Sequence, residues 1–194
     1  MKSYLALGDS YTIGELQPLH ASFPYQLVQL FRNSGIGIHA PEIVAKTGWT
    51  TDELTSHINS IKLNNSYDLV TLLIGVNNQY RGRTVDNFIP EIESLIQFAL
   101  SKSSNVVMLS IPDWGVTPFA EGKDKEKISN EIDMYNAACE KCAANAGIKF
   151  IDITASQRMD GSKAEFLAED KLHPSFKEYK KWAKEIFNIS TFFA

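Results

Sequence analysis

The sequence predicts an α/β fold in which a parallel sheet carries helices on both faces. Five short apolar runs of strand length recur along the 194 residues. Longer segments whose apolar residues have helical spacing separate these runs, and such alternation favours parallel strands. The run over residues 69–74 is apolar apart from Thr71, as expected of a strand buried on both faces.

The expected strands end at turn-forming residues. They cover residues 3–7, 42–46, 69–74, 106–111 and 148–153. Gly8-Asp9-Ser10 follows the first strand, Thr47-Gly48 the second and Gly75-Val76-Asn77 the third.

Helices are expected between these strands. They cover residues 22–33, 51–61, 84–101 and 125–146, and a last helix runs to about residue 189 and begins after Pro174 or with Pro174 at its first position. Gly35 and Gly147 stand just past two of them, where a left-handed glycine is common. Cys139 and Cys142 lie well inside an expected helix on its apolar face, which favours buried thiols over a redox pair.

Composition and charge favour a single globular domain over residues 1–194. A net charge of −4 offers no basic surplus for nucleic acid. No apolar stretch is long enough for stable insertion across a membrane. The first apolar run is too short for a signal peptide and stops at Asp9, so we expect a cytoplasmic protein.

Ser10 is the candidate nucleophile. Ligands of parallel α/β sheets bind outside the carboxyl ends of the strands, and Ser10 directly follows the first strand there. Serine needs a base to act as a nucleophile. Taken alone, Gly-Asp-Ser could equally be a turn with a helix cap.

His173 is the candidate base. Among the four histidines, only His173 has a carboxylate three residues earlier, Asp170, which could orient the imidazole and stabilise its charged form. A helix cap made by Asp170 or Ser175 is the structural alternative. The remaining histidines, expected at the surface or in local packing, are His20, His39 and His57.

Ester cleavage also needs donors for a developing oxyanion. The candidates are the Ser10 N–H, the Gly48 N–H and the Asn77 side-chain amide. Taken singly, a turn glycine would explain Gly48 and an Asx turn would explain Asn77. The histidines show no metal-ligand spacing, so no metal is expected.

Together these segments resemble the SGNH hydrolases, also called GDSL esterases. Matches to the family's four blocks, in order within residues 5–176, are Gly8-Asp9-Ser10, Gly48, Gly75-Val76-Asn77 and Asp170-Lys171-Leu172-His173. The resemblance implies a three-layer α/β/α sandwich with a five-stranded parallel sheet of flavodoxin-like type, without metal or organic cofactor. It implies Ser10 as nucleophile, His173 as base and Asp170 as its partner. It also implies an oxyanion hole formed by Ser10, Gly48 and Asn77.

Two positions depart from the family pattern. Its first block usually continues with leucine, where this chain has Tyr11, and its third usually ends in aspartate, where this chain has Asn78. Asparagine keeps an acceptor oxygen but carries no charge, so this exchange bears on how Asn77 is positioned. Residues expected near a substrate pocket are Asp9, Tyr11, Asn78, Arg81, Trp114 and Phe119. A solvated loop is the alternative for Arg81, and a cover over the sheet edge for the last two.

We therefore expect a serine esterase of small or short-acyl carboxylic esters, such as acetylated sugars or lysolipids. The expected partner is a small-molecule ester. One alternative is an acyltransferase, in which an acceptor alcohol replaces water. Others are an inactive interaction domain and a flavodoxin-like module that binds a phosphate with Ser10 and Thr12, although these give Asn77 and Asp170 no role. Phe192 and Phe193 could pack the tail onto the body or mark a dimer contact.

Overall fold

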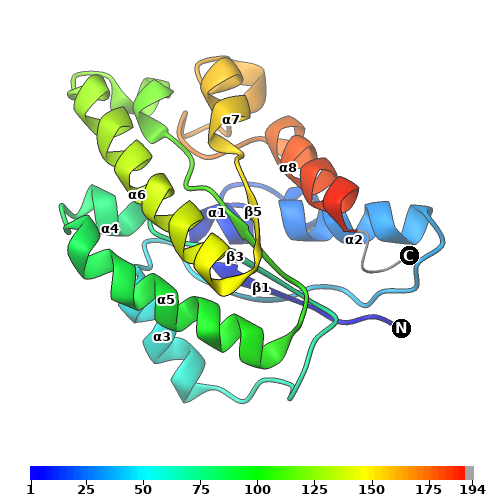
Figure 1. Ribbon diagram of the computed structural model, residues 1–194. Coiled ribbons are helices and arrows are strands. Elements are labelled where there is room, and N and C mark those ends of the chain that lie inside the picture. The colour runs from blue at the N-terminus through cyan, green and yellow to red at the C-terminus, as the bar shows by residue number, and fades with distance from the viewer. Residues whose placement is uncertain (191–194) are drawn as a thin grey trace.

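A computed structural model describes residues 1–190 and contains one five-stranded parallel sheet (Figure 1). The strands are β1 (Tyr4–Gly8), β2 (Glu42–Ala45), β3 (Leu69–Leu73), β4 (Val106–Leu109) and β5 (Lys149–Ile151), in the spatial order β2-β1-β3-β4-β5. Ala6 in β1 stands opposite Ile43 on one side and Thr71 on the other. The expected strands are confirmed, and every residue of β1, β3 and β4 is buried.

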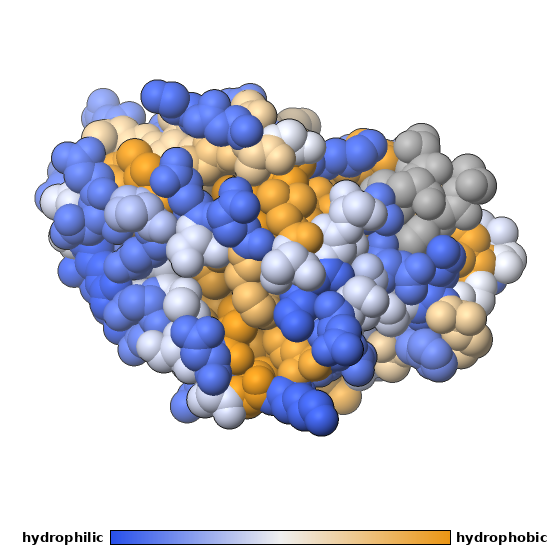
Figure 2. All heavy atoms as spheres, turned by 60° about the horizontal axis from the view of Figure 1, so that its bottom comes forward, coloured by the Kyte–Doolittle hydropathy of each residue, from blue (hydrophilic) through white to orange (hydrophobic). Residues whose placement is uncertain are grey.

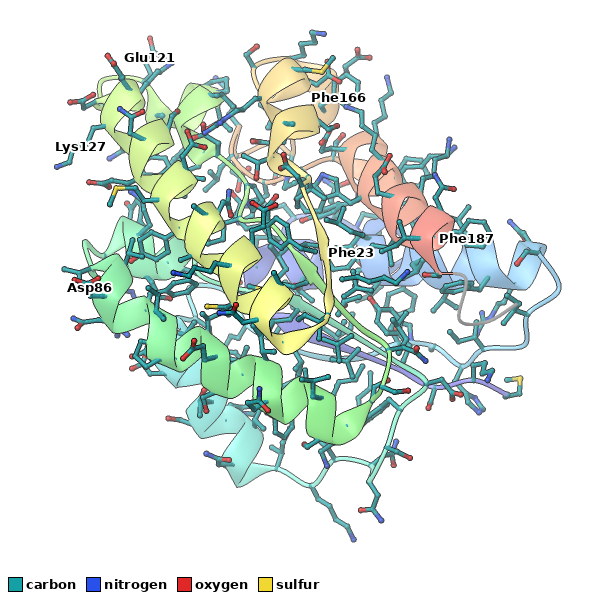
Figure 3. All side chains as sticks on the ribbon, in the orientation of Figure 1. Phe23, Asp86, Glu121, Lys127, Phe166 and Phe187 are labelled. Carbon is teal, nitrogen blue, oxygen red and sulfur yellow. The ribbon has the colours of Figure 1, made fainter. Side chains whose placement is uncertain are left out.

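The long helices cover the two faces of the sheet. Helices α2 (Phe23–Asn33) and α8 (Phe176–Ile189) pack together on one face, while α3 (Thr51–Ser60), α5 (Val85–Lys102) and α6 (Lys125–Ala146) lie on the other (Figure 1). Ring centroids lie 5.3 Å apart between Phe31 and Phe187 and 6.2 Å apart between Phe23 and Trp182. Figure 3 labels Phe23 and Phe187 at this contact between α2 and α8. The three-layer sandwich is therefore confirmed.

Capping residues fix where the helices begin and end. The Asp124 side chain accepts the Lys127 N–H at the start of α6, and Gly147 adopts φ +69 just after its end, so the expected bounds of this helix hold. Helix α8 begins after Pro174, as expected, and the alternative that Pro174 is its first residue was wrong. The Ser175 side chain accepts the Lys177 N–H and caps the helix, which begins only at Phe176.

Several short helices lie outside the helical ranges expected from the sequence. They are α1 (Ser10–Ile13), α4 (Val76–Tyr80), α7 (Thr154–Asp160) and the 3₁₀ turns η1 (Leu19–Ala21), η2 (Trp114–Val116), η3 (Pro118–Ala120) and η4 (Ala164–Phe166). Helices α1 and α4 closely follow β1 and β3. Because these parallel strands are neighbours in the sheet, both helices begin on the side of the sheet where the strands have their carboxyl ends.

The predicted role of the cysteines as buried thiols is confirmed. Cys139 and Cys142 are unpaired and buried in α6, and burial raises the pKa of both thiols.

Within residues 1–190, no helix is both long and apolar enough to cross a bilayer. Figure 2 shows one face of the molecule, where a band of hydrophobic residues runs between hydrophilic margins. Phe192 and Phe193 lie outside the described residues.

Candidate active site

Ser10 is held at the carboxyl end of β1 by a tight turn into α1. Asp9 caps this helix by accepting the Tyr11 N–H on Oδ1 at 3.0 Å. A Cβ atom at Gly8 would lie 2.1 Å from Thr12 Oγ1, so only glycine lets α1 fold back so closely on the strand. The nucleophile candidate therefore occupies a rigid position, with its backbone N–H at a helix N-terminus.

His173 stands in the loop that precedes α8. Asp170 Oδ1 accepts the N–H groups of Leu172 and His173, each at 3.0 Å. Lys171 adopts the left-handed region at φ +60, and the Ala168 N–H bonds the His173 carbonyl at 2.7 Å. These bonds turn the chain so that the imidazole and the carboxylate face one another.

Ser10, His173 and Asp170 form one chain of hydrogen bonds. Ser10 Oγ lies 2.8 Å from His173 Nε2, and His173 Nδ1 lies 2.5 Å from Asp170 Oδ2. Burial acts to raise the pKa of Asp170, but the bonds from the His173 ring and from two backbone N–H groups outweigh it and hold that pKa below its ordinary value. An ionised Asp170 can keep a proton on Nδ1, which leaves Nε2 free to accept the Ser10 proton.

The three residues from which oxyanion donors are expected all line one cavity. Ser10, Gly48, Asn77 and His173 all line a cavity of about 170 Å³. Gly48 adopts φ +83, a left-handed conformation that favours glycine. One N–H of the Asn77 amide donates to the Trp49 carbonyl at 2.9 Å. Since the amide has two donors, the second remains for a ligand in the cavity.

Aromatic rings form the far wall of this cavity. The Trp114 ring lies 5.4 Å from that of Tyr80 and 6.1 Å from that of Phe119, centroid to centroid. Its Nε1 donates to Gln79 Oε1 at 2.7 Å, which fixes the indole. The other lining residues are Tyr11, Thr47, Val76 and Leu172.

The sequence did not predict that Tyr80, Val76, Thr47 and Leu172 line the pocket. Tyr80 and Asn77 are three residues apart, a spacing that puts two side chains on one side of a helix. That signal was present in the sequence, but a helix of five residues produces no apolar periodicity by which to recognise it.

Half of the six residues expected near the pocket line it. Tyr11, Trp114 and Phe119 do, and the Tyr11 ring also lies 5.2 Å from the His173 ring. Asp9 is instead buried as the cap of α1, where desolvation raises its pKa to about 7. Asn78 is buried against Thr51 of α3.

Arg81 points to the protein backbone. It donates through Nη2 to the Gly48 carbonyl at 2.6 Å and pairs with Glu53 at 3.2 Å.

Neither the cavity nor any other part of residues 1–190 gathers three His, Cys, Asp or Glu side chains in the manner of a metal site. The expected surface positions of His20, His39 and His57 are confirmed, since all three are exposed.

Solved structures share this fold along the whole chain. A lipolytic protein of the G-D-S-L family from Veillonella parvula is 16% identical, with a TM-score of 0.79 over 97% of this chain and 98% of that one. An acetylxylan esterase from Geobacillus stearothermophilus is 17% identical, with a TM-score of 0.77 over 96% and 93% of the two chains. A lipase/acylhydrolase from Enterococcus faecalis is 22% identical, with a TM-score of 0.75 over 97% and 94%. At these identities the likeness shows the fold alone.

Family membership comes from the sequence comparison. The search of curated proteins found no match. The model of the GDSL-like lipase/acylhydrolase family matches residues 6–181, which include Ser10, Gly48, Asn77, Asp170 and His173. The chain therefore belongs to the GDSL-like lipase/acylhydrolase family.

Proposed function

We propose that this chain is a serine esterase that cleaves carboxylic esters of small, uncharged acyl groups. The observation that carries the proposal is the hydrogen-bonded chain from Ser10 Oγ through His173 to Asp170 at the edge of an apolar cavity. Membership of a hydrolase family supports the same reaction class. A flavin- or phosphate-binding module would leave this chain of hydrogen bonds without a role.

Acylation follows from the positions of these groups. His173 Nε2 takes the Ser10 proton as Oγ bonds to the ester carbonyl carbon, and Asp170 stabilises the imidazolium that forms. The carbonyl oxygen becomes an oxyanion, which the N–H groups of Ser10 and Gly48 and the free N–H of Asn77 stabilise. His173 then protonates the leaving alcohol as the carbon–oxygen bond breaks.

Deacylation repeats these steps with water. His173 takes a proton from water as the water oxygen adds to the acyl carbon, and the second oxyanion occupies the same hole. Its collapse breaks the bond to Ser10 Oγ, which recovers its proton from His173. The products are the free acid and the original enzyme.

The size and chemistry of the cavity indicate the acyl group. An apolar cavity of about 150 Å³ holds a benzene molecule, so the 170 Å³ beside Ser10 suits an acyl group of about six carbons or fewer. Apart from His173 and the tyrosines, no residue that lines the cavity has an ionisable side chain. A charged acyl group would therefore find no side chain of opposite charge there.

The test is hydrolysis of nitrophenyl esters from acetate to decanoate by the wild type, Ser10→Ala and Ser101→Ala. Ser101 is an exposed serine on α5, so its variant controls for serine removal as such. We expect turnover to peak at butyrate or hexanoate and to vanish in Ser10→Ala only. An organophosphate should add one phosphoryl group to the wild type, as measured by mass spectrometry, and none to Ser10→Ala.

Two results would contradict the proposal in different ways. Equal turnover in the wild type and Ser10→Ala would remove Ser10 as the nucleophile. A steady rise in kcat/KM up to decanoate would keep the nucleophile but reject the short-acyl pocket.

A further inference from the structure

The segment that carries Gly48 is fixed by side chains on either side of the glycine, since Thr47 bonds Glu15 and the Trp49 ring lies 4.8 Å from that of His57. Residues 46–49 lie between β2 and α3 outside regular structure, and all are at least partly exposed. Apart from its neighbours in the chain, a Cβ atom built at Gly48 would meet one heavy atom within 4 Å, Arg81 Nη2 at 3.8 Å. Little is packed against Gly48 itself, so hydrogen bonds to its peptide groups bear directly on the direction of the Gly48 N–H.

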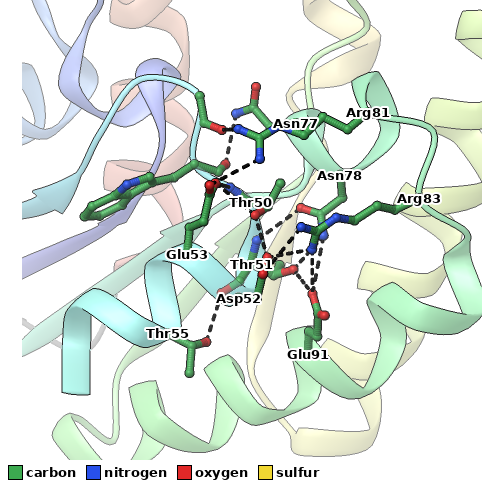
Figure 4. Close-up of polar contacts among 12 residues, drawn as sticks. Thr50, Thr51, Asp52, Glu53, Thr55, Asn77, Asn78, Arg81, Arg83 and Glu91 are labelled. Atoms are coloured by element: carbon green, nitrogen blue, oxygen red, sulfur yellow. Dashed lines mark hydrogen bonds and ion pairs between the residues drawn. The ribbon is translucent and has the colours of Figure 1, made fainter. Parts of the chain in front are cut away.

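Two side chains of the α4 segment supply such bonds to consecutive carbonyls. Arg81 Nη2 donates to the Gly48 carbonyl at 2.6 Å, and Asn77 Nδ2 donates to the Trp49 carbonyl at 2.9 Å (Figure 4). Asn77 lies in α4 and Arg81 directly follows it. The same short element thus presents one oxyanion donor and holds the peptide next to another.

Glu53 completes the arrangement from the α3 side. Its Oε1 accepts from Arg81 Nη1 at 3.2 Å, while its Oε2 accepts the Thr50 N–H at 2.9 Å. Bonds from Thr50 and Arg81 hold the pKa of Glu53 below its ordinary value, although burial opposes them, so the carboxylate remains charged. Arg81 is therefore tied both to the glycine and to the helix that follows it.

We propose that Arg81 is a positioning residue for the oxyanion hole. By holding the Gly48 carbonyl, it fixes the backbone of a left-handed glycine and so directs the Gly48 N–H into the cavity. This inference rests on the proposed esterase function. Arg81 itself lines no part of the cavity, so its effect should reach the transition state and spare substrate binding.

The expected effect is smaller than the loss of a donor. Removing an oxyanion donor typically lowers the rate by about 10²–10³-fold. Loosening one donor while leaving it in place should lower kcat by about tenfold, with KM unchanged.

The test compares Arg81→Ala and Arg81→Lys with Arg83→Ala. Arg83 is the matched control, because it bonds Asp52 of α3 at 2.6 Å without touching residues 46–50. We would measure kcat and KM on a short nitrophenyl ester. We would also measure the affinity for an alkyl trifluoromethyl ketone, to whose carbonyl carbon Ser10 Oγ adds while its proton moves to His173. The resulting oxyanion occupies the hole.

Arg81→Ala should lose about tenfold in kcat and the same factor in ketone affinity, and Arg83→Ala should lose neither. Lysine at position 81 can donate one bond to the Gly48 carbonyl and should recover part of the loss. Added guanidinium at a non-denaturing concentration should do the same for Arg81→Ala, whose vacated site is open to solvent. Thermal unfolding checks that each variant is folded.

Three results would overturn the inference and leave the proposed function standing. A kcat of Arg81→Ala within about twofold of the wild type rejects it, as does a rise in KM alone, which would mark a substrate contact instead. Equal losses of kcat and ketone affinity in Arg83→Ala would show that the effect does not depend on the bond to the Gly48 carbonyl. If wild-type turnover is absent or survives Ser10→Ala, the proposed function itself fails and the role of Arg81 falls with it.

Discussion

Replacing Asn78 by aspartate, the residue that usually ends the third block of the family, should destabilise this chain. Asn78 is fully buried, and its Nδ2 donates to Thr51 Oγ1 at 2.6 Å and to Glu91 Oε2 at 3.4 Å (Figure 4). Glu91 therefore already supplies a carboxylate at this place. An aspartate would set a second carboxylate oxygen beside it, with no proton between them.

The size of the effect follows from that distance. Two unit charges 3.4 Å apart repel by about 5 kcal/mol at an effective dielectric constant of about 20. The pair can instead bind one proton, which costs a carboxyl group of ordinary pKa about 4 kcal/mol at pH 7. Arg83 Nη1, 3.8 Å from Glu91 Oε2, offsets part of this cost. We expect Asn78→Asp to lower the free energy of unfolding by about 3 kcal/mol at pH 7.

The pH dependence has a definite sign. The folded variant would bind a proton that the unfolded chain releases above about pH 4, so its stability falls as pH rises. The loss should shrink to about 1 kcal/mol near pH 5, where protonation is cheap, and grow above neutrality.

The assay is urea unfolding, followed by tryptophan fluorescence near pH 5 and pH 7, of the wild type, Asn78→Asp, Glu91→Gln and the double variant. The double variant exchanges amide and carboxylate and restores one donor between them. It should be more stable than the two single losses predict, by about 2 kcal/mol or more. The reasoning is refuted if Asn78→Asp loses less than about 1 kcal/mol at pH 7, or if the two losses simply add.

Three further predictions concern buried groups. Burial raises the pKa of Asp9 from 3.8 to about 7, so the folded chain binds a proton there that the unfolded chain releases, and this contribution is lost as pH rises between those values. Relative to the wild type, Asp9→Asn should therefore gain about 4 kcal/mol of unfolding free energy between pH 4 and pH 8 in urea titrations; a constant difference would reject the shift. The buried Tyr179 hydroxyl finds no hydrogen-bond partner within residues 1–190, so Tyr179→Phe should stabilise by about 1 kcal/mol, whereas Tyr4→Phe, which loses a 2.7 Å bond, should destabilise in the same assay. Gly75→Ala should destabilise by about 3 kcal/mol in thermal unfolding, because φ is +129 and the new Cβ would lie 2.6 Å from Ile111 Cδ1; an unchanged melting temperature would contradict this packing.

The sheet could be predicted from sequence because its signal is local. The run from Leu69 to Ile74 is apolar apart from Thr71, which favours a strand buried on both faces, and β3 covers Leu69–Leu73. Helix α6 could be bounded to the residue because Asp124 and Gly147 mark its two ends chemically. The first residue of α8 could not be fixed from the sequence because proline and serine are both N-terminal signals, and in the structure the hydroxyl of Ser175 caps the helix.

The short helices at the strand ends could not be predicted in the same way. Helix α4 covers only Val76–Tyr80, too few residues to show a periodic apolar face. Without that helix, Asn77 looks like a residue of a turn, and Tyr80 has no visible relation to the cavity that it lines. The residues of the candidate site were recognisable by type, but the elements that orient them were not.

The pairings that hold the candidate site together lie beyond any local pattern. Arg81 and Gly48 are 33 residues apart, and Asn78 and Glu91 are 13 apart, so each contact exists only once β2, β3 and the helices around them are in place. A candidate site assembled from segments at several strand ends needs those segments held in place relative to one another. Hydrogen bonds between them add to the side-chain packing within each. A charged or amide side chain next to a block of the candidate site can therefore bind a neighbouring segment of the protein as readily as the substrate. In this chain Arg81 and Asn78 both bind the protein.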